Sequence, residues 1–316
     1  MVAGRRADLG AFVHPALFYS SEQEYLDGLV PFIANALADE QPVLVAVPGP
    51  NLALLRDALG TDADEITMAD MTQAGRNPGR ILGGVLSAFA GKYPQKSPQM
   101  IGEPIWASRS DVEYPACVQH EALINNAFAG RDLAVLCPYD ESQLDAGWVA
   151  DARLTHPELW QGSARQDSPD YAPDKVWAHY NQPLIRRDGA VTYRARTLAD
   201  LSDLRAFVAA YAQWFDLSPH TVVDLQVVVT ELATSSLQHT VGGCRLALWH
   251  HDDHLVCEAR DGGYIDDPLA GRRGYDNDTA RGRCLFVINA VADLVRVHTD
   301  RDGTTVHTYL RVDRAP

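Results

Sequence analysis

Residues 162–183 divide the 316-residue chain into two regions with different orders of helix and strand signals. This stretch, GSARQDSPDYAPDKVWAHYNQP, contains three prolines and no apolar periodicity, which is typical of a segment between domains. We therefore expect a first domain over residues 1–161, a linker over 162–183 and a second domain over 184–316.

The composition is that of a folded globular protein, with 46% hydrophobic and 22% charged residues. A net charge of −15 disfavours a general nucleic-acid surface, which needs clustered Lys and Arg. The apolar runs are far shorter than a membrane span, and MVAGRRADLG at the N-terminus lacks the apolar stretch of a signal peptide. We expect a cytoplasmic protein that binds neither nucleic acid directly nor a membrane.

The cysteines are five in number, widely spaced and without a CxxC pair. This pattern favours reduced thiols over disulfides or a structural zinc site. The residues are Cys117, Cys137, Cys244, Cys257 and Cys284.

Helix and strand signals alternate in the first region. Residues 20–40 begin with a Ser-x-x-Glu pattern and continue with apolar residues at helical spacing. QPVLVAVP, which follows, reads as a strand buried on both faces. The alternation continues to a strand over 132–140 and predicts an α/β domain with a largely parallel sheet.

The second region places helices before strands. Helix signals cover 200–217 and 218–243, and the second of these opens with Ser218 as a cap and Pro219 in its first turn. Two strands, a helix and two more strands are expected to follow, which predicts an α+β sandwich: a mostly antiparallel sheet with helices on one face. The glycine-containing segment 264–281 has no apolar period and is expected to form a mobile lid.

Short motifs in the second region place polar or glycine residues at the ends of predicted elements. One helix carries Glu, Ser and His at a spacing of four, so these side chains share a face. Other motifs follow a strand, connect the last two strands, or begin a helix, where backbone N–H groups favour phosphate. The residues concerned are Glu231, Ser235, His239, Asp261, Gly263, Gly282, Cys284, Gly303 and Thr304.

This order of motifs resembles the GHKL ATPase superfamily over about residues 195–313, and ARGRCLFVINAVADLVRV resembles its anti-sigma serine-kinase branch. The resemblance implies ATP and Mg²⁺ as cofactors, Glu231 as catalytic base and Asp261 as the adenine contact. Ser235 stands where the family has a magnesium-binding Asn, and Cys284 stands where it has a glycine. We therefore expect weak or absent ATP and Mg²⁺ binding, with kinase activity weakened or lost.

Several segments of the first region, among them HPALFYSSEQEYLDGLVPFI, GEPIWASRS and HEALINNAF, resemble the MEDS sensory domain over about residues 12–160. The resemblance implies signal sensing. HEALI is not a zinc-protease motif, because Ile124 stands where the second metal-binding His would be. Polar or aromatic residues in the matched segments could line a ligand pocket or simply fix loops, with Glu103 and Trp106 favoured because Gly-Glu-Pro before an indole is an unusual strand end. The candidates are His14, Glu103, Trp106, His120, Asn125 and Asp140.

Together the two resemblances suggest an actinobacterial anti-sigma regulator. The leading hypothesis is that the second domain binds a sigma factor or the antagonist protein that releases one, while the first domain senses a small-molecule signal. One alternative is an active kinase that phosphorylates Ser or Thr of an anti-sigma-factor antagonist. Another is a small-molecule-binding module without a sigma partner. The sequence leaves open whether the chain is an enzyme and whether it forms a homodimer.

Overall fold

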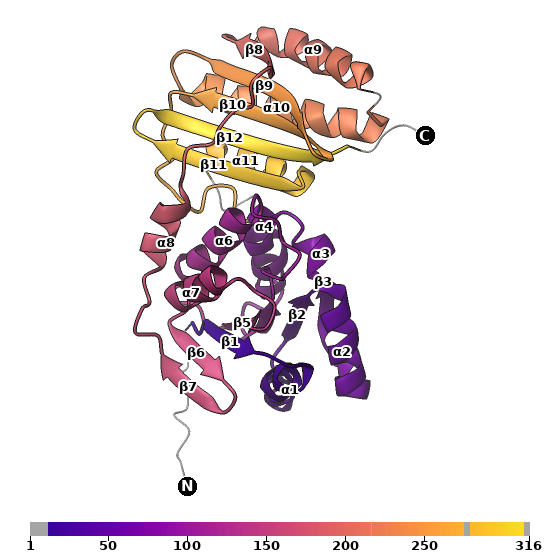
Figure 1. Cartoon of the computed structure of the whole chain (residues 1–316), viewed down its shortest axis with the longest axis vertical. Helices are drawn as coiled ribbons and strands as arrows, with labels where there is room; N and C mark the ends of the chain where they lie inside the picture. The colour runs from indigo at the N-terminus through magenta and orange to yellow at the C-terminus, as the bar shows by residue number, and fades with distance from the viewer. Residues whose placement is uncertain (1–11, 216, 275–278, 313–316) are drawn as a thin grey trace. The chain divides into compact units, whose positions relative to one another are not determined.

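The computed structural model describes residues 12–215, 217–274 and 279–312 (Figure 1). These residues fall into two compact units. The first unit is built from residues up to 76 and from 85–180, and the second from 77–84 and from 181 onward. The three-part division expected from the sequence stays a prediction.

A seven-stranded sheet forms the centre of the first unit, in the order β3-β2-β4-β5-β1-β6-β7. Neighbouring strands are parallel except for the antiparallel pair β6 and β7. The central strands β1 and β2 are buried along their whole length, as their unbroken apolar sequences require. This confirms the predicted α/β class. The strands are β1 Pro15–Tyr19, β2 Val43–Val47, β3 Thr67–Asp70, β4 Gln99–Gly102, β5 Ala134–Asp140, β6 Glu158–Gln161 and β7 Ala164–Asp167.

Helices connect the parallel strands of this sheet. The first begins where the Ser-x-x-Glu pattern predicts, because the Ser21 hydroxyl accepts a hydrogen bond from the Glu24 N–H. Residues 78–90 form three consecutive helical elements, namely α4, a π-helical stretch η2 and α5. The helical elements up to residue 180 are α1 Glu22–Ala38, α2 Gly49–Leu59, η1 Gly60–Glu65, α3 Met71–Ala74, α4 Pro78–Arg80, η2 Ile81–Ser87, α5 Ala88–Ala90, α6 Tyr114–Ala127, α7 Ala146–Thr155 and α8 Pro173–Tyr180.

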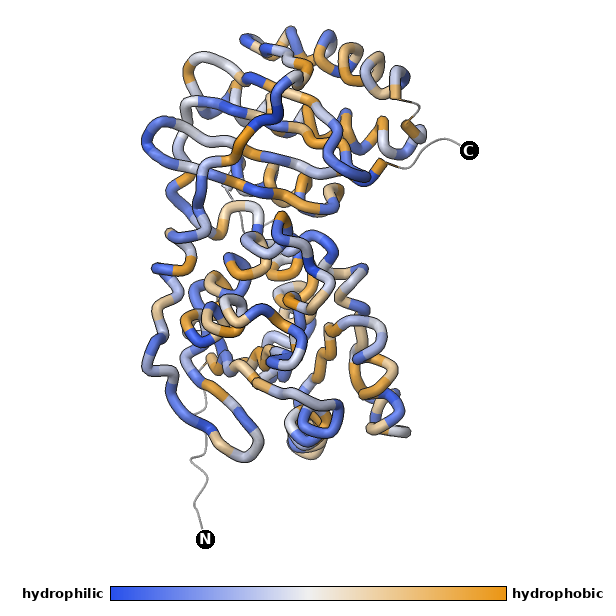
Figure 2. The backbone as a smooth tube through the Cα atoms, in the orientation of Figure 1, coloured by the Kyte–Doolittle hydropathy of each residue, from blue (hydrophilic) through white to orange (hydrophobic). Residues whose placement is uncertain are grey.

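The stretch 162–183, expected to be a linker, contains β7 and α8. β7 pairs with β6, and α8 packs against α6 and α7. The stretch that contains β7 and leads to α8 is mainly hydrophilic (Figure 2), and all four residues of β7 are exposed. β7 therefore forms without the apolar periodicity from which sequence analysis recognises a strand. α8 does carry a helical period, because Val176 is buried, and Trp177 and Tyr180, the latter at helical spacing from both, are half-buried.

The second unit contains a five-stranded sheet in the order β11-β12-β10-β9-β8, with every neighbouring pair antiparallel. Apolar side chains of its three long helices and of the sheet share one core, which confirms the predicted α+β class. Strand β8 was not expected. The elements are β8 Val191–Ala195, α9 Asp200–Trp214, α10 Pro219–His239, β9 Cys244–His251, β10 His254–Asp261, α11 Ala280–Val291, β11 Leu294–Asp300 and β12 Gly303–Arg311.

The segment 264–281, expected to form a mobile lid, is packed over its first part. Leu269 and Arg272 are buried, and the Ile265 N–H donates to Thr299 Oγ1 at 2.9 Å. Residues 275–278, which belong to the same expected lid, lie outside the described residues.

All five cysteine thiols are free and buried. Within the described residues, no helix combines the length and the apolar character that crossing a bilayer requires.

Candidate functional site

A small cavity of the second unit lies where the motifs of α10, β10, α11 and β12 converge. Its volume is about 20 Å³, which is room for roughly one water molecule and far below the several hundred Å³ of a typical ligand pocket. Four of the predicted nucleotide-binding residues line it: Ser235, Asp261, Cys284 and Thr304. The motifs therefore come together in space, but the space between them is nearly filled.

Asp261, at the end of β10, has its carboxylate occupied by donors of the same unit. Ser236 Oγ donates to Asp261 Oδ2 at 2.6 Å, and the Gly263 N–H donates to Oδ1 at 2.7 Å. Arg281 Nη2 lies 3.2 Å from Oδ1 and 3.3 Å from Oδ2. The carboxylate that the GHKL resemblance assigns to adenine thus already accepts three internal donors.

Arg281 closes the cavity from the first turn of α11. Its guanidinium also donates to the Tyr264 backbone oxygen at 3.1 Å, and its side chain is only 16% exposed. The ion pair with Asp261 is therefore partly shielded from water, which makes it stronger than a pair on an open surface. An adenine at Asp261 would have to displace this side chain.

Cys284 lies inside α11 and packs against α10. Its thiol donates to the Glu231 backbone oxygen at 3.0 Å, and burial raises the pKa of the thiol to about 12. Its backbone is helical and has no positive φ. A side chain in place of the family's glycine therefore causes no backbone strain here, although it occupies space next to the cavity.

Two predicted glycines have steric reasons to be glycine. A Cβ at Gly303, where φ is +140°, would lie 2.3 Å from the Asp261 backbone oxygen. A Cβ at Gly263 would lie 2.5 Å from Thr240 Cγ2, and the Gly263 oxygen accepts from Thr304 Oγ1 at 2.7 Å. Gly303 thus permits the close approach of β10 and β12 beside the cavity, and Gly263 permits the close approach of the chain after β10 to Thr240, the C-cap of α10.

The remaining predicted nucleotide residues lie around the cavity without lining it. The Gly282 N–H donates to the capping Thr279 hydroxyl of α11 at 3.0 Å. Glu231 is half-buried, and His239, the last residue of α10, is exposed. Ser236, which the four-residue spacing did not select, makes the contact to Asp261 instead of Ser235.

A second cavity, of about 320 Å³, opens in the first unit at the carboxyl ends of β1, β2, β4 and β5. Open α/β sheets bind their ligands at this edge. Three of the predicted sensory residues line the cavity: Glu103, Trp106 and Asp140. Tyr19 and Asn51 line it as well, and the sequence analysis had not singled them out.

Glu103 is the most buried acid of this cavity, with 3% of its surface exposed. Burial raises the pKa of its carboxyl to about 8, so the group is mostly protonated and neutral at pH 7. Asn51 Nδ2 donates to Oε1 at 3.1 Å and to Oε2 at 2.9 Å, and Tyr25 OH donates to Oε2 at 3.3 Å. These contacts fix an uncharged carboxyl at the cavity wall.

Trp106 and Asp140 have local partners in addition to the cavity. The Arg109 guanidinium lies 3.8 Å from the centre of the Trp106 ring, and Trp106 Nε1 donates to Ser108 Oγ at 2.8 Å. Asp140 Oδ1 accepts from the Ser142 N–H at 2.9 Å. The indole is thus held in place by an ion on one face, and the carboxylate also stabilises a turn.

The other predicted sensory residues do not line this cavity. His14 and Asn125 are joined to each other, with 3.1 Å between His14 Nδ1 and Asn125 Oδ1. His120 is buried on α6. Three of the six candidates, Glu103, Trp106 and Asp140, therefore line the cavity. The other three, His14, His120 and Asn125, lie elsewhere in the first unit.

Comparison with known proteins supports two assignments. Residues 13–157 match the model of the MEDS (MEthanogen/methylotroph, DcmR Sensory) domain. Residues 195–309 match the model of the histidine kinase-like ATPase domain. Comparison with curated proteins gave no significant match.

Among solved structures, one similar chain is the RsbU and RsbW domains of Rv1364c from Mycobacterium tuberculosis, at 14% identity and a TM-score of 0.30. The similarity covers 40% of this chain and 33% of that chain, and it is too distant to add to a functional argument. The two domain matches establish that this chain joins a MEDS sensory domain to a histidine kinase-like ATPase domain.

Proposed function

We propose that the chain is a signalling regulator of the anti-sigma type, in which the ATPase-like unit binds a protein and the MEDS unit binds a small molecule. The protein partner is a sigma factor or its antagonist. The observation that carries the proposal is the occupied carboxylate of Asp261, held by Arg281 and Ser236. A site filled by its own side chains favours a binding role for this unit over ATP turnover.

The cavity of the MEDS unit supports a small uncharged ligand. A protonated Glu103 can donate a hydrogen bond to an acceptor on the ligand, whereas a second carboxylate would be repelled by Asp140 on the same wall. Trp106 adds an apolar surface to the lining. A molecule with one oxygen acceptor and a short apolar part satisfies these groups.

Exposed apolar side chains of the second unit support a protein partner. Trp214 at the end of α9 is 84% exposed, and Val223 on α10 is 57% exposed. Trp is one of the residue types most enriched among those that dominate binding energy at protein interfaces. We therefore assign Trp214 to the partner contact.

Binding of the full-length chain to purified sigma factors and antagonists of the source organism tests the proposal. We expect one of them to bind, and Trp214→Ala to weaken the complex at least about 10-fold, since interface Trp residues often contribute 2 kcal/mol or more. Ile185→Ala is the control, because Ile185 is also exposed, at 88%, but precedes the helices. Binding should be measured by calorimetry or interferometry.

The alternatives give different results in the same experiment. Transfer of phosphate from Mg-ATP to the antagonist would identify an active kinase and overturn the binding-only role of the ATPase-like unit. A chain that binds a small molecule but none of these proteins would overturn the anti-sigma assignment and leave a sensory module with another output.

A further inference from the structure

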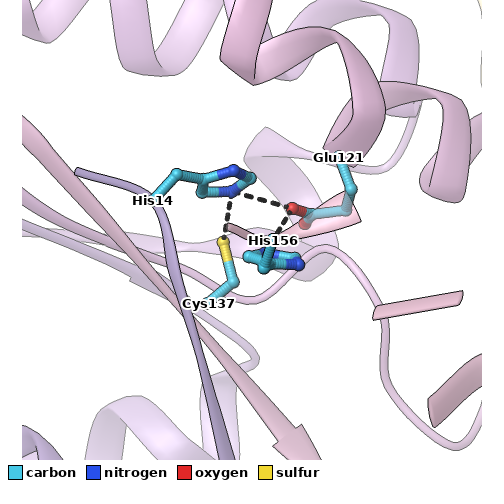
Figure 3. Close-up of side chains that lie close together, drawn as sticks. All are labelled: His14, Glu121, Cys137 and His156. Atoms are coloured by element: carbon cyan, nitrogen blue, oxygen red, sulfur yellow. Dashed lines mark hydrogen bonds and ion pairs between the residues drawn. The ribbon is translucent and has the colours of Figure 1, made fainter. Parts of the chain in front are cut away.

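Four chemistry-bearing side chains meet in the interior of the first unit, away from the residues that line its cavity (Figure 3). His14 immediately precedes β1, and Glu121 lies on α6. Cys137 lies on β5, and His156 ends α7. None of them is more than 1% exposed, and one donor atom from each lies within 4.8 Å of all the others.

Three of the six distances between these atoms are close to the edges of a metal-centred tetrahedron, and the other three are within 4.8 Å. Glu121 Oε2 lies 3.3 Å from His14 Nε2 and 3.2 Å from His156 Nε2, and Cys137 Sγ lies 3.5 Å from His14 Nε2. Zinc bonds of about 2.0 Å to nitrogen or oxygen and about 2.3 Å to sulfur place such ligands about 3.3 Å and about 3.6 Å apart at tetrahedral angles.

Hydrogen bonds on the far side of both rings determine which nitrogen faces the group. Asn125 Nδ2 donates to the Thr155 oxygen at 2.8 Å, so Asn125 Oδ1 is the atom that accepts from His14 Nδ1 at 3.1 Å. His156 Nδ1 lies 2.8 Å from the Ala152 oxygen, which can only accept. Each Nδ1 therefore carries a hydrogen, and each Nε2 of a neutral ring presents a lone pair. Metal-binding histidines are oriented by outer contacts of this kind.

Three of the four inward-facing groups then present acceptors, and the Cys137 thiol, 3.5 Å from His14 Nε2, is the one donor among the four. Within the described residues, Glu121 Oε1 and Oε2 and His156 Nε2 have no hydrogen-bond partner with acceptable geometry. Buried acceptors that face one another are costly unless a cation lies between them.

We propose that His14, Glu121, Cys137 and His156 form a closed four-coordinate site for a divalent transition-metal ion, with zinc as the preferred ion. Two imidazoles, a thiolate and a carboxylate are ligands that zinc accepts. On binding, the Cys137 thiol releases its proton to solvent and a sulfur–metal bond forms. The thiolate and carboxylate then neutralise the two positive charges of the ion.

A site with four protein ligands and no exposed edge is structural and not catalytic, because no coordination position remains for a substrate. The ion would connect β5 and the start of β1 to α6 and α7. Metal binding would therefore stabilise the sheet that carries the cavity of this unit. This role does not depend on which protein binds the second unit.

The competing arrangement is a metal-free cluster in which protons on the histidines bridge to Glu121. Metal analysis of the full-length protein, unfolded and refolded with Zn²⁺ or Co²⁺, separates the two. We expect about one ion per chain, a near-ultraviolet thiolate-to-cobalt band, and X-ray absorption at the zinc edge that shows one sulfur and three nitrogen or oxygen ligands. A protein that retains neither ion overturns the proposal.

Variants identify the ligands. Cys137→Ser should abolish the thiolate-to-cobalt band. Cys117→Ser is the control and should keep the band, because Cys117 is also fully buried but lies on α6, outside the group. Glu121→Gln should keep the band and weaken zinc binding at least about 10-fold. A band that persists in Cys137→Ser overturns the proposal. If Cys137→Ser fails to fold, the X-ray absorption spectrum of the wild-type protein decides, since absence of a sulfur ligand overturns it.

Discussion

Arg281 and Asp261 form an ion pair, with 3.2 Å between Nη2 and Oδ1, at the carboxylate that the GHKL resemblance assigns to adenine. The two side chains are 16% and 8% exposed. The ATPase-like unit therefore supplies its own ligand to the residue that would otherwise recognise a nucleotide.

Removing this internal ligand should strengthen nucleotide binding. Arg281→Ala frees Asp261, and loss of a partly shielded ion pair of about 1 kcal/mol corresponds to about 5-fold tighter Mg-ATP binding. Calorimetry with Mg-ATP measures the change. Arg283→Ala is the control, because Arg283 is on the same helix but does not line the cavity. Weaker binding in Arg281→Ala would mean that this side chain contacts the nucleotide.

The two neighbouring serines of α10 should differ in their effect on stability. Ser236→Ala removes a buried donor to a carboxylate and should lower the free energy of unfolding by about 1–3 kcal/mol. Ser235→Ala should cost less, because Ser235 is only half-buried. Urea unfolding followed by circular dichroism compares them. A larger loss of unfolding free energy in Ser235→Ala than in Ser236→Ala would show that the Ser235 hydroxyl contributes more to stability, and would contradict this prediction.

Glu103 should make the first unit less stable as the pH rises. Its folded pKa of about 8 lies above its ordinary value of 4.5, so the folded state binds a proton that the unfolded state releases. Stability is therefore lost between about pH 4.5 and 8, by at most about 1.4 kcal/mol per pH unit. Denaturant unfolding of wild type and Glu103→Gln across this range measures the difference.

Glu22→Gln serves as the exposed control for this experiment and should follow the pH dependence of the wild type. If Glu103→Gln also follows the wild type, the carboxyl of Glu103 is charged at neutral pH. The neutral-ligand proposal for the cavity would then lose its basis.

Limited proteolysis should cut the chain in the stretch that follows α8, and not in β7 or α8. Residues 182–189 form a largely exposed stretch without helix or strand, whereas Arg165 belongs to β7 and lies over the Trp160 ring at 4.0 Å. Trypsin is therefore expected to cut first after Arg186 or Arg187. Mass spectrometry of the fragments identifies the cut, and early cleavage after Arg165 would show that β7 opens readily.

The class of each fold followed from the sequence because alternation and helical periodicity are strong in the core elements. β2 has an unbroken apolar run, and α10 has a capping Ser218 followed by Pro219. β7 was missed because its exposed polar residues carry no periodic signal. α8 was missed because its helical spacing of Val176, Trp177 and Tyr180 is short and lies in a proline-containing stretch. β7 forms because its backbone pairs with β6, and this pairing is a tertiary contact.

The cavity residue Glu103 was predictable from its unusual turn, but its partners were not. Asn51 and Tyr25 reach it from α2 and α1, and only the topology of the sheet brings these helices together. The proposed metal ligands illustrate the same limit. They come from four elements, so they lack the short CxxC or HExxH spacing by which a zinc site is recognised in sequence.

Spacing also left out one residue of α10. A family pattern with Asn four residues after Glu231 directed attention to Ser235. The observed contact to Asp261 comes from Ser236, which is turned toward β10. Cys284, which stands where the GHKL family has a glycine, lies in a regular helix, so Cys284→Gly should not improve nucleotide binding through the backbone.

The polar strand β7 has a consequence for how the first unit behaves apart from the rest of the chain. An unprotected sheet edge invites pairing with the edge of another molecule, and charged, solvent-facing edge strands suppress it. A fragment ending at residue 161 would lack β7 and leave the backbone of β6, with Trp160, open to such pairing. A fragment ending after α8 at residue 180 would keep β7 at the sheet edge. We expect this fragment, and not the shorter one, to remain free of aggregation at high concentration.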